Sequence, residues 1–311
     1  MRFQPSWVIE SLHPHSVDSV FFPISPRAEA LLWLKKQGIQ IYANDPLHSN
    51  AILLKAYLEN QGETFSEENQ QKFNRVIKEP LDVSMNPFRE WLGKPFDRRQ
   101  IDYLFYWREA AVEIAEQVQR NLFYSAIRSV ISYWLDMVIA KIPIAFAPDE
   151  ILGHAIKKQL QQIFPGKEKV FALNVPMEEL GDEVEASVFL LPLKIQERYF
   201  REFECEDYFH AWIVGNSNLE ASRRDIENSR RSWVFDWKYP LEATKIFQKV
   251  GKANHAVICW SGEELPPRLH EEQIVEPFRK AFSGKFQKNF LYMKTSDLSR
   301  DDYDFLLVFQ K

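Results

Sequence analysis

The sequence predicts an α/β protein whose open, mainly parallel sheet is interrupted by a helical insertion. Short apolar runs alternate with helical patterns near both ends of the chain, which is typical of βαβ units. Between them, amphipathic helical stretches replace the strand patterns. We therefore expect three parts, with the two portions of the α/β domain at 1–60 and 166–311 and a helical subdomain at 61–165.

The first 60 residues predict a strand–helix–strand–helix unit. Apolar, β-rich runs cover 17–24 and 39–43, and a helical pattern follows each of them, over 26–37 and 47–59. Proline near the start of the first helical pattern and Gly38 just after its end are placed as helices prefer them. Two strands joined by such a helix are expected to be parallel neighbours.

Residues 61–165 predict helices. The longest apolar pattern, from Leu122 to Ile142, is apolar on nearly every side, so we expect a central helix there. After residue 165 strand patterns return, and the last two predict an antiparallel edge of the sheet. A polar, charged segment at 216–235 is expected to be an exposed loop. The expected later elements are strands at 169–174, 185–192, 255–260, 285–294 and 303–311, and helices at 197–214 and near 270–282.

Composition narrows the classes of function. The chain has 311 residues and a net charge of −5, so nucleic acid or an anionic membrane would have to be bound through a local basic patch. The two cysteines, Cys205 and Cys259, lie far apart, which favours free thiols in a reducing cytoplasm. We expect no metal site. We also expect no membrane span, because no apolar run approaches the roughly 20 residues that a span needs.

Ligands of an open α/β sheet bind beyond the carboxyl ends of its strands. Asn44 and Asp45 follow the second expected strand, and Asn174 follows the third. An acid at the end of a second strand is where nucleotide-binding α/β proteins often hold a ribose hydroxyl. Asn-Asp-Pro also makes a good strand stop and helix cap, and both interpretations stay open.

Several segments together resemble the D12-class DNA adenine N6-methyltransferases. QGIQIYANDPLHSNAILLKAYLEN resembles that family's second strand, which ends in Asn-Asp, and the helix after it. SVFLLPLKIQERYF resembles its catalytic strand and the following helix, and HAVICWSGEELP resembles the next strand. The helical stretch from residue 98 to 131 is similar to one that a bacterial branch of the family inserts. The resemblance implies a Rossmann-like S-adenosylmethionine-dependent methyltransferase fold.

Two motifs of that family are degraded here. The family binds S-adenosylmethionine with a glycine-rich turn after the first strand, whereas this chain has FFPISPRAEALL there and no glycine before Gly38. Its catalytic loop is Asp or Asn, two prolines and an aromatic, and it holds and stacks a flipped adenine. The corresponding positions are Leu191, Pro192, Leu193 and Lys194, which lack both the hydrogen-bond acceptor and the ring. A catalytic loop at this position is therefore not expected to work.

The densest basic cluster is SRRDIENSRRSW. It contains Arg223, Arg224, Arg230 and Arg231, which could meet a nucleic-acid backbone. Asp225 dilutes the charge, so a solvated loop is the simpler interpretation.

Three hypotheses follow. The first is a catalytically inactive methyltransferase-like protein that binds DNA or a partner protein. The second is an active S-adenosylmethionine-dependent DNA adenine N6-methyltransferase with divergent motifs, in which Asn44, Asp45 and Asn174 bind the cofactor. The third is a structural or regulatory protein without a nucleic-acid role. Only the second requires S-adenosylmethionine as a cofactor.

Overall fold

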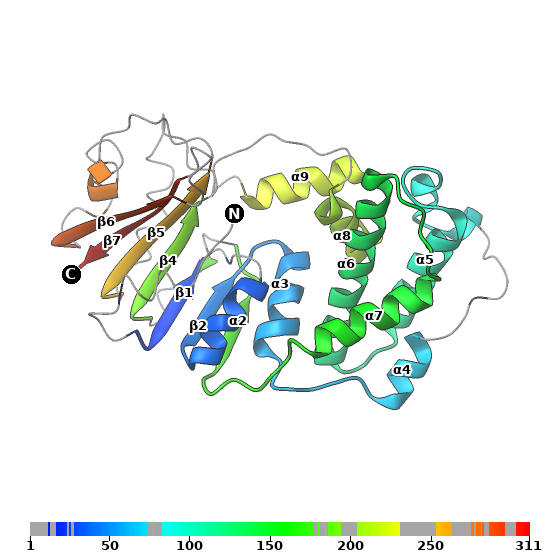
Figure 1. Cartoon of the computed structure of the whole chain (residues 1–311), viewed down its shortest axis with the longest axis horizontal. Coiled ribbons are helices and arrows are strands. Elements are labelled where there is room, and N and C mark those ends of the chain that lie inside the picture. The colour runs from blue at the N-terminus through cyan, green and yellow to red at the C-terminus, as the bar shows by residue number, and fades with distance from the viewer. Residues whose placement is uncertain are drawn as a thin grey trace. The chain divides into compact units, whose positions relative to one another are not determined.

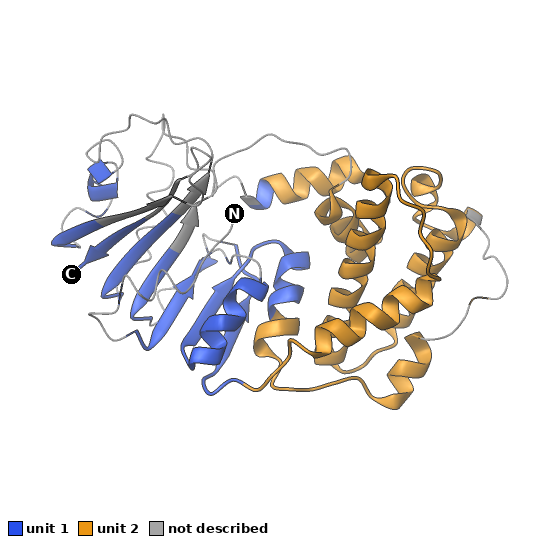
Figure 2. Ribbon diagram, viewed as in Figure 1, with its two compact units in different colours: residues 1–54, 166–198, 228–311 blue, residues 55–165, 199–227 orange. Residues whose placement is uncertain are grey.

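The chain folds into two compact units, as a computed structural model shows. Residues 1–54, 166–198 and 228–311 form unit 1, which contains the sheet, and residues 55–165 and 199–227 form the helical unit 2 (Figure 2). The structure describes residues 12, 17–23, 25, 28–73, 77, 83–176, 179–180, 184, 186–193, 204–230, 253–262, 275–276, 278–280, 282, 286–295 and 303–311.

Unit 1 contains a mixed sheet, which has seven strands within the described residues, in the order β3-β2-β1-β4-β5-β7-β6 (Figure 1). The first five pair in parallel, β7 runs antiparallel to β5, and β6 runs antiparallel to β7. The predicted α/β class is confirmed, as is an antiparallel C-terminal part of the sheet. The strands are β1 (Ser19–Phe22), β2 (Gln40–Asn44), β3 (Val170–Leu173), β4 (Val188–Leu193), β5 (His255–Gly262), β6 (Lys288–Thr295) and β7 (Tyr303–Gln310).

The central strand β1 is buried throughout. Its residues Val20, Phe21 and Phe22 are at most 5% exposed, and β2 and β4 pair with it on its two sides. A continuous apolar run is what a parallel strand in such a position requires. The helix α2 (Ala28–Gln37) connects β1 to β2, and α3 (His48–Leu54) follows β2.

The order of the strands reverses at β1. The chain adds β2 and then β3 on one side of β1, and it returns with β4 on the other side. β1 pairs with β4 only through Val20–Phe21 against Val188–Phe189, so the last four residues of β4 pair with β5 alone. The carboxyl ends of β1 and β4 therefore lie at a topological switch point, where ligands of open α/β sheets bind.

Unit 2 consists of helices. A π-helical turn η1 (Lys55–Glu59) continues directly from the end of α3. The sequence placed the helical part at 61–165, whereas the compact unit begins at residue 55 and also takes in 199–227. Its further elements are α4 (Glu67–Phe73), η2 (Val83–Met85), η3 (Arg89–Trp91), α5 (Arg98–Val112), α6 (Gln117–Ala140), α7 (Pro148–Leu160), α8 (Cys205–Val214) and α9 (Leu219–Arg230).

Aromatic side chains build the core of unit 2. Trp107 of α5 stacks on Trp134 of α6, with ring centroids 6.0 Å apart. Two indole N–H groups tie the later segment to the earlier helices: Trp212 Nε1 donates to the Leu104 carbonyl (2.8 Å), and Trp91 Nε1 donates to the Ser217 carbonyl (2.9 Å). Because these donors are satisfied across segments distant in sequence, α8 and α9 belong with α5 and α6.

The central helix α6 lies where its all-round apolar pattern predicted. It alone among the described helices has a length and composition that would also suit a membrane span. The sequence had led us to expect no segment of this kind. Half of its most apolar window is buried inside the unit, which is consistent with the core helix of a soluble protein. A cytoplasmic location stays a prediction.

Lys35 of α2 is buried, with 1% of its surface exposed. Its aliphatic stem lies against Gly166, where an added Cβ would be 3.1 Å from both Cγ and Cε of Lys35. Burial lowers the pKa of the Lys35 ammonium from 10.5 to about 8. The folded protein therefore releases this proton at a lower pH than the unfolded chain does.

We expect the free energy of unfolding to rise by about 1–2 kcal/mol between pH 7.5 and 9.5, because the unfolded chain binds the Lys35 proton more tightly over this range. Urea denaturation at several pH values measures the change. Lys35→Met removes the titrating group and should flatten the profile, whereas Lys36→Met, at the exposed neighbouring position, should leave it unchanged. Equal profiles for the wild type and Lys35→Met would contradict this expectation.

Candidate functional site

The carboxyl ends of β1, β2 and β3 are joined through one side chain. Asn44 is fully buried, and its Nδ2 donates to the carbonyls of Pro23 (3.0 Å) and Val175 (3.1 Å). Its Oδ1 accepts from the Val175 amide (3.1 Å), and its own carbonyl accepts from the Ser25 amide (2.8 Å). The residues that follow β1 and β3 are thus both bound to the end of β2.

Asp45 holds the turn that leads into α3. It is 7% exposed; Oδ1 accepts from the Leu47 amide (2.9 Å) and Oδ2 from Asn50 Nδ2 (3.0 Å). A side chain that accepts from the amide two residues later forms an Asx turn, a common link between a strand and a helix. Both carboxylate oxygens therefore have partners within the fold, as the structural interpretation of Asn-Asp-Pro requires.

Asn174 completes this group. Its Nδ2 donates to the carbonyls of Asp45 (2.9 Å) and Pro46 (3.1 Å), and its Oδ1 lies 3.1 Å from His48 Nδ1. The structure thus brings together Asn44, Asp45 and Asn174, which the sequence nominated separately. We call them the strand-end network. Their polar groups bind the protein itself, which limits what they can offer to a ribose or any other ligand.

The turn after β1 contains no glycine. Pro23 has no amide hydrogen, and its carbonyl accepts from Asn44. Ser25 gives its amide hydrogen to the Asn44 carbonyl. These two described residues of the turn therefore leave no backbone donor directed at a cofactor, in contrast to a glycine-rich turn. Ile24, Pro26 and Arg27 lie outside the described residues.

Three of the four positions that the resemblance equates with a catalytic loop, Leu191, Pro192 and Leu193, form the carboxyl half of β4. The backbone of Leu191, Pro192 and Leu193 pairs with β5, opposite Ile258, Cys259 and Trp260. Since β1 does not reach this far, a proline without an amide hydrogen is tolerated in the strand. The side chains of these residues, and the whole of Lys194, lie outside the described residues.

The arginine-rich segment was predicted to be a loop, and this was wrong for Leu219–Arg230, which form helix α9. Asn218 caps the helix, because its Oδ1 accepts from the Ala221 amide (3.1 Å). Ser222 and Ile226, four residues apart, are 3% and 6% exposed, so one face of the helix is buried. This cap and this spacing were present in the sequence but were masked by the high density of charge.

The arginines of α9 do not share one environment. Arg223 Nε donates to Asp207 Oδ2 of α8 at 2.6 Å, while Arg224 is exposed. Arg230 is the last residue of α9, its side chain outside the described part, and Arg231 lies wholly outside it. Of the four predicted nucleic-acid contacts, one is thus held by an acid of the same unit. A four-arginine patch stays a prediction.

Burial sets the electrostatics of the Asp207–Arg223 pair. The Asp207 side chain is 9% exposed, and burial raises the pKa of its carboxyl even though the Arg223 guanidinium opposes the shift. The hydrogen bond to Asp207 in turn raises the pKa of Arg223. The arginine therefore compensates a carboxylate that is costly to bury, which is a structural role.

No metal centre is found among the described residues, where no group of three or more His, Cys, Asp or Glu side chains is placed to hold an ion. Cys205 Sγ donates to the Arg128 carbonyl at 3.6 Å, and burial raises the pKa of its thiol to about 11. Such a thiol is a poor nucleophile at neutral pH. Cys205 and Cys259 are free cysteines.

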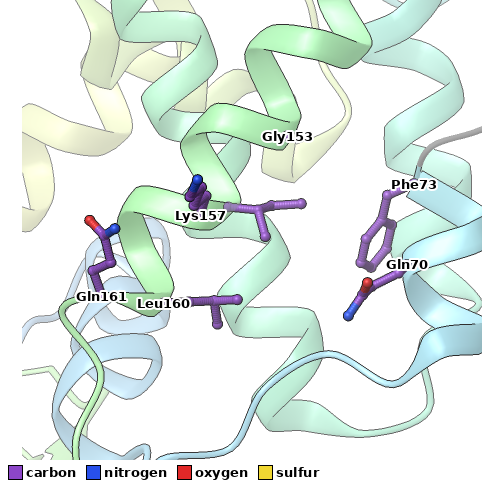
Figure 3. A pocket seen from close by; sticks show the side chains of 7 residues that line it. Gln70, Phe73, Gly153, Lys157, Leu160 and Gln161 are labelled. Atoms are coloured by element: carbon purple, nitrogen blue, oxygen red, sulfur yellow. The ribbon is translucent and has the colours of Figure 1, made fainter.

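A pocket in unit 2 escaped the sequence analysis. It measures about 490 Å³ and lies between α4 and α7 (Figure 3). A sequence signal that could have pointed to it is Gly153, a glycine inside a helical pattern. Its lining residues are Gln70, Phe73, Gly153, Ile156, Lys157, Leu160 and Gln161.

Asn44→Ala should lower the free energy of unfolding by about 2–4 kcal/mol, because it leaves two carbonyls and one amide near the strand ends without their partner. Urea denaturation measures the loss. His48→Ala, at an exposed position beside Asn174, is the control and should cost less than about 0.5 kcal/mol. A similarly small effect of Asn44→Ala would show that the strand ends do not depend on this amide.

Arg223→Ala should destabilise the protein by about 1–2 kcal/mol at pH 7, since it leaves the nearly buried Asp207 carboxylate without its cation. The loss should shrink as the pH falls through the pKa of Asp207, because the protonated acid needs no cation. Arg224→Ala, at the neighbouring exposed position, serves as the matched control. Equal effects of the two substitutions on thermal unfolding would argue against the structural role of Arg223.

The comparisons with known proteins assign no family to this chain. No protein-family model matches it, and no curated protein matches it either. Its function is therefore inferred from the sheet, from the residues at the strand ends and from the resemblance seen in the sequence.

Proposed function

We propose that this protein is a methyltransferase-like α/β protein without catalytic activity, which acts as a binding module for DNA or for a partner protein. The sheet supports the fold part of the proposal. The order β3-β2-β1-β4-β5-β6 is that of doubly wound nucleotide-binding sheets, here with the reversed β7 inserted before the last strand.

The strand-end network is the main support for the proposal that this protein no longer binds S-adenosylmethionine. A cofactor ribose would need acceptors from Asp45, yet Asp45 Oδ1 and Oδ2 already bind Leu47 and Asn50. The backbone near β1 would have to donate to the cofactor, yet the Ser25 amide is bound to Asn44. Asp45 and the Ser25 amide are thus already engaged within the fold, which supports the proposal that S-adenosylmethionine is no longer bound.

The position of β4 supports the loss of catalysis. Leu191, Pro192 and Leu193 end a strand beside the switch point, where the resemblance implies the catalytic loop. Leucine and proline side chains neither accept a hydrogen bond from an adenine amine nor stack on its ring as an aromatic does. A methyl transfer at this position would need other residues.

Two alternatives make different use of the same residues. An active DNA adenine N6-methyltransferase with divergent motifs is favoured by the retention of Asp45 at the end of β2. A structural or regulatory protein without a nucleic-acid role is favoured by the net charge of −5 and by the engagement of Arg223 with Asp207. The first alternative requires cofactor binding and the second requires that DNA does not bind.

Isothermal titration calorimetry with S-adenosylmethionine and S-adenosylhomocysteine tests the loss of the cofactor. We expect no saturable binding of either ligand up to about 1 mM. Saturable binding by the wild type that Asp45→Asn abolishes would overturn the proposal and revive the enzyme. Asp45→Asn is preferred to alanine, because Oδ1 can still accept from the Leu47 amide and keep the turn.

The salt dependence of binding tests whether DNA is the ligand. Anisotropy of a fluorescent DNA duplex should rise with protein at low salt and fall back as salt is added if the phosphate backbone is the ligand. Absence of binding at low salt would exclude DNA and leave the partner protein.

A further inference from the structure

The pocket between α4 and α7 has the size of a ligand site. Its volume of about 490 Å³ falls within the roughly 300–1,000 Å³ of small-molecule sites, which also occur between the helices of bundles. All seven lining residues belong to unit 2. The site is thus separate from the strand-end network.

The apolar wall of the pocket is rigid on one side. Phe73 is fully buried; it stacks on Phe123 with ring centroids 4.0 Å apart and meets Phe65 edge-on at 5.1 Å. Leu160 of α7 faces Phe73 across the pocket (Figure 3). The buried ring of Phe73 therefore supports the pocket from beneath, and the half-buried side chains of Ile156 and Leu160 are the apolar surface that a ligand can contact.

Gly153 opens the pocket on the α7 side. It lies inside the helix Pro148–Leu160, where glycine costs about 1 kcal/mol relative to alanine. A Cβ added at Gly153 would meet no atom within 4 Å, so no close packing contact requires glycine here. The missing side chain instead leaves space at the pocket wall and lets a ligand approach the backbone.

Lys157 gives the pocket its charge. It lies one helical turn after Gly153, is exposed, and forms no ion pair with any residue of the described part of the chain. Gln70 uses its amide nitrogen to donate to the Phe65 carbonyl (3.2 Å). The ammonium of Lys157 is therefore the lining group best suited to an anion.

We propose that this pocket binds a small unbranched monocarboxylate. The apolar chain lies along Ile156 and Leu160 and passes over Gly153, while the carboxylate pairs with the Lys157 ammonium. An apolar body with one anionic end is the chemistry that matches an apolar wall with one cation at its edge. This binding site is independent of the proposed loss of methyltransferase function.

Octanoate is the probe, titrated into the full chain by calorimetry at pH 7.5. We expect a Kd of about 0.1–1 mM, as the limited energy per atom of small ligands allows. Gly153→Leu should abolish binding by filling the pocket. It should also raise the thermal midpoint, because leucine favours the helix more than glycine does, so loss of binding would not reflect misfolding.

Two comparisons isolate the contribution of charge. Lys157→Ala should weaken octanoate about three- to fivefold, as an exposed ion pair does, while Lys158→Ala, next in sequence and not lining the pocket, should change nothing. The neutral analogue 1-octanol should bind more weakly than octanoate and should not respond to Lys157→Ala. Absence of octanoate binding at millimolar concentration, unchanged binding by Gly153→Leu, or equal affinity for 1-octanol would each overturn the proposal.

Discussion

The side-chain amide of Asn44 is the interaction on which the strand ends of this sheet depend. Parallel strands have no tight turns to join them, so their carboxyl ends must be held by contacts between distant segments. Asn44 makes these contacts with Pro23 and Val175, and Asn174 and Asp45 extend them to α3. The same hydrogen bonds engage the Asp45 carboxylate and the Ser25 amide within the protein itself, and this engagement is what supports the proposed loss of cofactor binding.

A second constraint acts on unit 2, whose segments are far apart in sequence. Aromatic rings fill its core, and the indoles of Trp91 and Trp212 donate to carbonyls of other segments. A buried indole requires such a partner, which makes each contact specific. The arginine of α9 plays a similar role by compensating Asp207. The same aromatic packing holds Phe73 beneath the pocket between α4 and α7, so this part of the pocket is formed before any ligand binds.

Local patterns determined much of the fold. The apolar runs predicted β1 to β5 to within a few residues, because burial on both faces imposes a recognisable composition on parallel strands. The nearly all-round apolar pattern predicted α6. The charged segment 219–230 was misjudged, because a helix with only one buried stripe, marked by Ser222 and Ile226, resembles a solvated loop in composition. Of the candidate site, sequence placed Asn44, Asp45 and Asn174 at strand ends.

Only the tertiary structure decided what those residues do. Sequence left Asp45 open between a ribose contact and a turn. Its carboxylate binds the nearby Leu47 and Asn50, and its backbone carbonyl accepts from Asn174, more than a hundred residues away. The pairing of β7 between β5 and β6, the membership of α8 and α9 in the helical unit and the pocket beside Gly153 also arise from long-range contacts. Such contacts produce no periodic pattern in the sequence. Each needs only one residue on either side, and residues of several types could form it.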